Sequence, residues 1–83
     1  MAEFDKTDTY EKIVEVVVKK LSLDPSEITK EATFQDLGAD SLDMFEILTR
    51  LQEVFGIEID DDAADNITSL REAVEYIHSR RTK

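Results

Sequence analysis

One run of apolar residues near the start of the chain most strongly limits what this sequence can fold into. Its members are three or four residues apart, so they form one stripe along an α-helix: Tyr10, Ile13, Val14, Val17, Val18 and Leu21. Thr7 or Asp8 is expected to cap this helix. Because β-branched valines lower intrinsic helix propensity, the helix needs its stripe buried against other elements. The chain must therefore form a packed helical core.

Two further segments show helical spacing. Residues 41–55 are expected to form a helix that ends at Gly56 in a left-handed conformation, with this core stripe: Met44, Ile47, Leu48, Leu51, Val54 and Phe55. Ser69 and Glu72 have the spacing of a capping box, and the helix after them has one apolar face made of Leu70, Ala73, Val74 and Ile77.

Shorter elements connect these helices. Asp24 can cap a short helix that starts at Pro25, and there is room for another short helix between Asp60 and Ile67. The long connection before residue 40 is expected to be pinned onto the core by four apolar anchors: Ile28, Ala32, Phe34 and Leu37.

The composition agrees with an all-α fold. The 83 residues include two glycines, one proline and no cysteine, so few tight turns and no disulfides are available. We expect residues 1–83 to form a single domain, an antiparallel four-helix bundle of three main helices and one short helix. A monomer is expected.

The chain is strongly acidic, with a net charge of -10. Between Glu31 and Asp65 there are eleven acidic residues against a single basic one, Arg50. This surface would repel nucleic acid and anionic lipid, so neither is an expected partner. Its charge serves either solvation or the recognition of basic partners.

Nothing in the sequence indicates insertion into a membrane or export. No apolar run approaches the roughly 20 residues of a membrane span, and residues 1–5 lack the basic start and apolar stretch of a secretion signal. A cytoplasmic location is therefore expected.

A distinct segment precedes the second long helix: Asp36-Leu37-Gly38-Ala39-Asp40-Ser41-Leu42-Asp43. Asp40 can act as N-cap, Asp43 adds negative charge where the helix dipole favours it, and Gly38 permits a left-handed turn. Together they place the Ser41 hydroxyl at the start of a helix.

Ser41 has no expected catalytic base. The one histidine, His78, lies near the end of the last helix, where we expect it to face solvent, and no glycine stands two positions after Ser41 to form a nucleophile elbow. The sequence therefore predicts no catalytic residues and no enzyme.

Four aspartates, Asp60, Asp61, Asp62 and Asp65, could offer oxygen ligands to a metal ion. They lack the alternating spacing and the final glutamate of an EF-hand loop, so no dedicated metal site is predicted. Loose binding of divalent cations that relieves repulsion stays open as a hypothesis.

Three motifs together resemble the acyl carrier protein family: Gly38-Ala39-Asp40-Ser41-Leu42, Phe55-Gly56-Ile57-Glu58-Ile59 and Ile67-Thr68-Ser69-Leu70. The resemblance runs from about Tyr10 to Ile77. It implies an acyl carrier domain in which Ser41, flanked by Asp40 and Leu42, receives a 4'-phosphopantetheine arm from coenzyme A. A separate holo-acyl carrier protein synthase attaches the arm, whose thiol then holds acyl groups as thioesters.

The resemblance also implies a docking surface for partner enzymes that carry basic patches. The matching acidic positions are Asp40, Asp43, Glu46, Glu53, Asp61, Asp62 and Asp65. Leu42 and Phe45 lie beside the core stripe and fit either a wide core face or a docking strip, and the resemblance favours docking. A cavity that shelters the acyl chain is implied around Ile47, Leu51 and Phe55.

The resemblance points to type II fatty acid synthesis or a related lipid pathway. Departures from the commonest bacterial pattern at Met44-Phe45, Thr49, Arg50 and Asp60 leave open a carrier dedicated to another pathway, such as a polyketide or peptidyl carrier. A protein of a different class, an acidic helical interaction module without a prosthetic group, is the further alternative.

Overall fold

Helices make up most of the chain, as the apolar spacing predicts. A computed structural model describes residues 6–81. Residues 1–5, on which the expected lack of a secretion signal depends, and Lys83 lie outside this range. The elements in chain order are α1 (Lys6–Leu21), the 3-10 helix η1 (Pro25–Glu27), α2 (Ser41–Phe55), α3 (Asp61–Asn66) and α4 (Leu70–Arg81).

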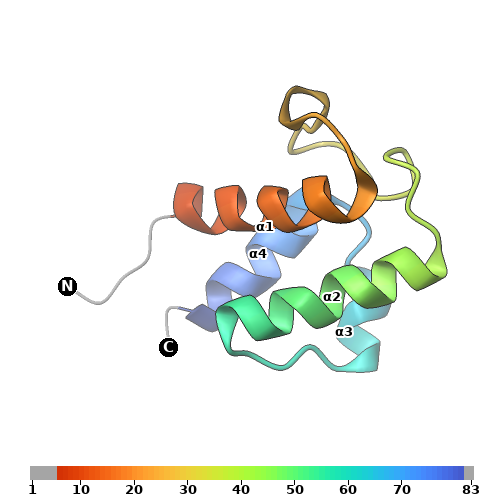
Figure 1. Ribbon diagram of the computed structural model, residues 1–83. Coiled ribbons are helices and arrows are strands. Elements are labelled where there is room, and N and C mark those ends of the chain that lie inside the picture. Colours follow the sequence, from red (N-terminus) through yellow and green to blue (C-terminus); the bar gives the residue numbers. More distant parts are fainter. Residues whose placement is uncertain (1–5, 82–83) are drawn as a thin grey trace.

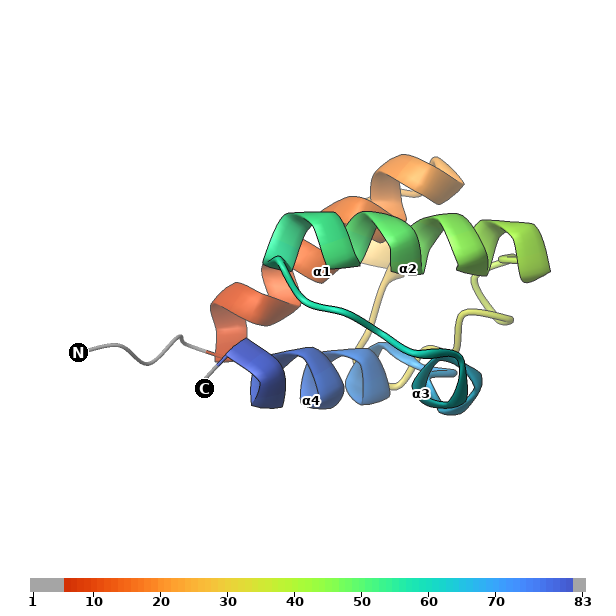
Figure 2. The ribbon, with the colours of Figure 1, turned by 90° about the horizontal axis from the view of Figure 1, so that it is seen from below.

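Helix α1 is central to the arrangement because it packs against both α2 and α4. It runs in the opposite direction to both of them (Figures 1 and 2). The short α3 lies below the N-terminal half of α2 in Figure 1 and is seen end-on in Figure 2. The predicted all-α bundle of three main helices and one short helix is confirmed. None of the helices within residues 6–81 is long and apolar enough to cross a membrane.

The predicted core stripes contribute to the core, but several of their residues are only half-buried: Tyr10, Val14, Val18 and Leu21 of α1, and Met44 and Phe55 of α2. Ile13 and Val17 of α1 are buried, as are Ile47 and Leu51 of α2 and the whole predicted face of α4. Val54, predicted as core, is 41% exposed, so that prediction is wrong. The apolar stripe of α2 is wider than the strip that α1 covers, and Val54 is left at its edge.

The ends of α2 are the predicted ones. Asp40 caps the helix and forms a capping box with Asp43, and Gly56 follows the last turn with φ 66°. Asp24 caps η1 with Pro25 in its first turn, also as predicted. These predictions succeed because caps depend on residues within about four positions of one another.

The starts of α1 and α4 differ in detail from the prediction. Helix α1 already begins at Lys6, so Thr7 and Asp8 lie in its first turn instead of capping it. At α4 the Ser69 hydroxyl accepts the Glu72 N–H at 3.3 Å, as a capping box requires. The Glu72 carboxylate, however, accepts the N–H of Thr68, one residue earlier than the box predicts.

The long connection before α2 is fastened to the start of α4. Ile28 and Phe34 are buried, whereas the side chain of Ala32, a predicted anchor, is only half-buried. Ala32 instead contributes its carbonyl, which accepts the Leu70 N–H at 3.1 Å. The Phe34 N–H donates to the Thr68 carbonyl at 3.0 Å. These hydrogen bonds and buried side chains fix the position of the connection that leads into α2.

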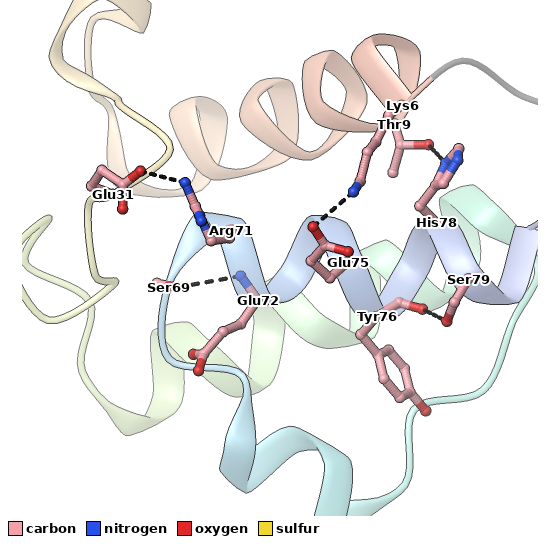
Figure 3. Close-up of polar contacts among 10 residues, drawn as sticks. All are labelled: Lys6, Thr9, Glu31, Ser69, Arg71, Glu72, Glu75, Tyr76, His78 and Ser79. Carbon is pink, nitrogen blue, oxygen red and sulfur yellow. Dashed lines mark hydrogen bonds and ion pairs between the residues drawn. The ribbon is translucent and has the colours of Figure 1, made fainter.

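Polar contacts join the start of α1 to the end of α4 (Figure 3). Thr9 is fully buried, and its hydroxyl forms a 3.1 Å hydrogen bond with Nδ1 of His78. The prediction that His78 faces solvent is wrong because the buried Thr9 hydroxyl needs a partner. The Arg81 side chain, only 9% exposed, reaches Asp8 at 3.1 Å. It also donates to the Thr9 hydroxyl at 2.9 Å.

Candidate functional site

Ser41 is the first residue of α2, and its side chain is exposed. The turn before it is anchored by a buried residue, since the Phe34 carbonyl accepts the N–H groups of Leu37 at 3.1 Å and Ala39 at 3.0 Å. Gly38 lies within this turn with φ 91°, a conformation that side chains disfavour. The buried phenyl ring thus fixes the backbone that presents Ser41.

The helix start around Ser41 has free donors for an anion. Two of the first N–H groups are used by the capping box: that of Asp43 donates to Asp40 Oδ1 at 2.8 Å, and that of Asp40 donates to Asp43 Oδ2 at 3.2 Å. The box leaves the N–H groups of Ser41 and Leu42 as the first-turn donors it does not engage. A phosphate ester on the Ser41 oxygen therefore fits this position.

A groove of about 790 Å³ opens beside Ser41. We call it the Ser41 groove. Its apolar lining comes from the connection before α2, from α2 itself and from the region of α3: Phe34, Ala39, Met44, Phe45, Leu48, Ala64 and Ile67. Its only charged lining residues are Asp40 and Asp65. The groove has the apolar surface that an acyl chain requires.

The acyl cavity that the resemblance implies around Ile47, Leu51 and Phe55 stays a prediction, and the Ser41 groove is separate from it. None of Ile47, Leu51 and Phe55 lines it, and the first two are fully buried in contact with the rest of the core. The sequence identified the apolar residues of α2. It could not tell which of them close-pack against α1 and which face the connection and α3.

Glu72 of α4 forms hydrogen bonds with Thr68, one of the residues that line the Ser41 groove. Thr68 lines the groove, and both its hydroxyl and its N–H donate to Glu72 Oε1, at 2.7 and 2.8 Å. These hydrogen bonds stabilise the charged carboxylate, so the Thr68 donors hold the pKa of Glu72 below its ordinary value. The spacing of Ser69 and Glu72 predicts only a helix-capping role for Glu72.

Leu42 and Phe45 are prominent on the surface next to Ser41. They are 64% and 67% exposed, so the interpretation that they widen the core is wrong. Large exposed apolar side chains side by side with a reactive position are typical of an interaction site. Docking of a partner on Leu42 and Phe45 stays a prediction.

In the described part of the chain, the predicted acidic docking residues fall into two groups, those without an ion pair and those with one. Asp40 and Asp43 stand at the start of α2, while the three acidic residues of α3, all exposed, lie below the same half of α2 (Figure 1): Asp61, Asp62 and Asp65. Glu46 and Glu53 are exposed too, but each forms an ion pair, with Lys20 of α1 and with Arg50 of α2. The pair with Lys20 spans two helices, and no local sequence pattern signals it.

The aspartates near α3 do not assemble a metal site. Asp60, one of the four considered, caps α3 by accepting the Ala63 N–H at 2.8 Å. Within residues 6–81, no three acidic, histidine or cysteine side chains are placed so that they could hold one metal ion.

Ser41 is also distant from the histidine. The Ser41 groove includes Thr68, just before α4, whereas His78 lies in the last turn of α4 and is bonded to Thr9. A helical bundle that presents an exposed serine beside an apolar groove, with its histidine at the other end of α4, defines a carrier domain rather than a hydrolase.

Comparison with known proteins gives the family. Residues 11–77 match the family described as "Phosphopantetheine attachment site". The chain is 44% identical over 79 residues to an acyl carrier protein of Rubrobacter xylanophilus, covering 94% of this chain and 98% of that protein. It is 42% identical over 77 residues to an acyl carrier protein of Guillardia theta, covering 92% and 95%.

The chain therefore belongs to the acyl carrier protein family. The resemblance drawn from the three motifs is confirmed, as is the prediction that the protein is a carrier and not an enzyme. The prosthetic group of the family is phosphopantetheine.

Proposed function

We propose that Ser41 bears the 4'-phosphopantetheine arm and that the protein carries acyl groups as thioesters on the thiol of that arm. The observation that supports this most is the exposed Ser41 hydroxyl at the start of α2, beside an apolar groove of about 790 Å³. The chain has no cysteine, so the thiol must come from the prosthetic group.

The residues around Ser41 have separate tasks in this function. The N–H groups of Ser41 and Leu42, with the helix dipole, favour the phosphate of the arm. Asp40 keeps the helix start in place through the capping box. The Ser41 groove accommodates an acyl chain and limits its contact with water. No base is needed in this chain, because a synthase activates the serine oxygen.

The proposed partners are a holo-acyl carrier protein synthase and acyl-transfer enzymes with basic docking patches. All the acidic residues predicted for docking except the half-buried Asp43 are exposed, which supports docking, and Phe45 supplies an apolar contact among them. Exposed charge pairs add little affinity each, but they accelerate encounter and permit fast release. Transient docking of this kind suits a protein that moves between enzymes.

The pathway and the location are the finer part of the proposal. We place the protein in the cytoplasm, as one domain over residues 1–83, in type II fatty acid synthesis or related lipid synthesis. The continuous core that links α1, α2 and α4 supports the single domain. Acyl transfer from fatty acid synthesis enzymes, measured against transfer from polyketide or peptidyl carrier enzymes, distinguishes the pathways.

Intact mass spectrometry tests the attachment site. After incubation with coenzyme A, Mg2+ and a holo-acyl carrier protein synthase, we expect the mass to rise by one phosphopantetheinyl unit. Ser41→Ala should abolish the gain, because it removes the exposed hydroxyl at the start of α2.

Ser26→Ala is the matched control, since Ser26 is an exposed serine on η1, and it should gain the arm normally. No gain in the natural chain would favour the interaction module without a prosthetic group. A gain that persists in Ser41→Ala would place the arm on another residue.

A further inference from the structure

The charged residues that line the grooves on the two sides of α2 differ. On the side toward α3, the Ser41 groove has only acidic charged residues in its lining, Asp40 and Asp65. On the side toward α1, a smaller groove of about 300 Å³ is lined by three basic and two acidic residues: Lys19, Lys20, Arg50, Glu15 and Glu46. We call this second depression the α1–α2 groove.

Two ion pairs account for the mixed charge of the α1 side. Lys20 at the end of α1 pairs with Glu46 of α2. Arg50 Nη1 lies 3.2 Å from Glu53 Oε1, one turn further along α2. Both carboxylates are exposed, so a partner can reach them, but each already has a cation of its own chain beside it.

These pairs do little for folding and more for recognition. An exposed ion pair contributes about 0–1 kcal/mol to stability. A neutral pair, however, attracts a distant cation far less than a lone carboxylate does, because the fields of its two charges nearly cancel. A basic side chain that approaches Glu46 or Glu53 also meets repulsion from Lys20 or Arg50.

The acidic residues at the Ser41 end of α2 differ from Glu46 and Glu53 in their ion pairing. Within residues 6–81, no basic side chain forms an ion pair with Asp40 or Asp43, nor with any of the three acidic residues of α3, Asp61, Asp62 and Asp65. These carboxylates keep their full negative field. The unneutralised charge of the docking helix is therefore gathered around Ser41.

We propose that Lys20 and Arg50 are specificity-determining residues. By neutralising Glu46 and Glu53, they confine the attractive surface to the Ser41 end of α2 and to α3. The matching partner has its basic residues clustered where it receives Ser41 and presents an acidic or uncharged surface to the α1–α2 groove. A partner with basic residues along the whole length of α2 is disfavoured. This inference rests on the proposed function, because the partners are the enzymes that act at Ser41.

The test is loading of the apo protein by a disfavoured partner, a bacterial holo-acyl carrier protein synthase whose basic residues extend along the whole length of α2. Loading is measured at about 0.15 M salt, where charges beyond about 8 Å are screened. Lys20→Gln with Arg50→Gln frees both carboxylates, and we expect kcat/KM to rise about two- to fivefold. Glu46→Gln with Glu53→Gln should lower kcat/KM by less than about twofold in the natural chain. In the Lys20→Gln, Arg50→Gln background the same pair should remove the whole gain.

Lys12→Gln with Arg80→Gln is the matched control. It removes the same net charge from a groove at the opposite end of α2, next to Val54 and Gly56. It should leave loading at the natural rate, and thermal unfolding of each variant shows whether the fold is kept. The proposal is overturned if this control gives the same gain, or if Glu46→Gln with Glu53→Gln costs equally in both backgrounds.

The proposed function and the role of Lys20 and Arg50 are tested by different outcomes. If the natural chain gains no phosphopantetheinyl mass, the proposed function is wrong. If it is loaded but Lys20, Arg50 and their carboxylates show no coupling in this cycle, only the role of Lys20 and Arg50 is wrong.

Discussion

The grooves on the two sides of α2 differ in volume and in charge. The Ser41 groove on the α3 side measures about 790 Å³ and its only charged residues are acidic. The α1–α2 groove measures about 300 Å³ and carries a mixture of lysine, arginine and glutamate. Part of the difference comes from the neighbours of α2, because α1 contributes Lys19 and Lys20 to one groove while α3 contributes Asp65 to the other.

This contrast supports the proposal that the two sides of α2 have separate roles in loading and in partner choice. The α3 side holds the serine, the apolar space and the unneutralised charge. The α1 side holds most of the packing between the first two helices, and its edge at Val54 is left 41% exposed. Substitutions on the two sides are therefore expected to have different effects.

The largest expected difference is in the free energy of unfolding, when one apolar residue that lines each groove is replaced by alanine. Phe34 lies behind the Ser41 groove and is 2% exposed, so Phe34→Ala should lower the free energy of unfolding by about 3–5 kcal/mol. Val54→Ala in the α1–α2 groove should cost less than about 1 kcal/mol, because that side chain is already partly in water. Urea unfolding of both variants measures this. Equal losses would mean that the two grooves are equally well packed.

The next difference concerns polar contacts on the two sides. Asp40→Ala removes the capping box of α2 and should cost about 1 kcal/mol of unfolding free energy. Arg50→Ala breaks an exposed ion pair with Glu53 and should cost no more than about 0.5 kcal/mol. Thermal unfolding followed by circular dichroism compares them. A larger loss for Arg50→Ala would show that the Arg50–Glu53 pair supports the helix and not only recognition.

Exposed apolar side chains offer a comparison at the level of function. Phe45, 67% exposed on the Ser41 side, should tolerate Phe45→Ala within about 0.5 kcal/mol of stability. Loading by a holo-synthase should nevertheless fall about fivefold, equivalent to about 1 kcal/mol of lost contact. Val54→Ala on the other side is the control and should load at the natural rate. A loss of the same size in Val54→Ala would extend the docking surface to the α1 side.

The smallest expected effect is the pH dependence of the Ser41 groove wall. The pKa of Glu72 is lowered from 4.5 by the Thr68 donors, so its carboxylate is more acidic in the folded chain than in the unfolded one. It therefore contributes stability above about pH 4.5, which is lost as the pH falls through the folded pKa. Glu72→Gln should be less stable than the natural chain at neutral pH, and the two should converge in acid.

Thr68→Val is the companion variant for this prediction, because it removes the hydroxyl donor and keeps the size of the side chain. Urea unfolding at a series of pH values should show a weaker pH dependence in Thr68→Val than in the natural chain. If Glu72→Gln instead keeps the same deficit down to the lowest pH, Glu72 acts through packing and not through its charge.

Prediction from the sequence succeeded where structure depends on near neighbours. The bounds of α2, its caps at Asp40 and Gly56, and the turn at Gly38 follow from residues within a few positions, and all were identified. The position of Ser41 at a helix start belongs to the same group. For Leu42 and Phe45 beside it, the spacing alone fits either a wide core face or a docking strip, and their exposure excludes the core face.

Apart from the local differences at the starts of α1 and α4, the errors concern contacts between distant parts of the chain. His78 bonds to Thr9 across 69 positions, and Arg81 reaches Asp8 across 73. Val54 is 41% exposed in the α1–α2 groove although its spacing matches the core stripe of α2. No local pattern carries this information.

The sequence by itself determined that the chain is helical, where α2 begins and ends, and that one serine stands at a helix start. These features follow from spacing, caps and turns, whose energies are local. The tertiary structure alone decided which side of α2 is open, which carboxylates are neutralised and which residues seal the end of the bundle. Those outcomes depend on how helices pack, because burial and ion pairing between helices are set by which faces meet.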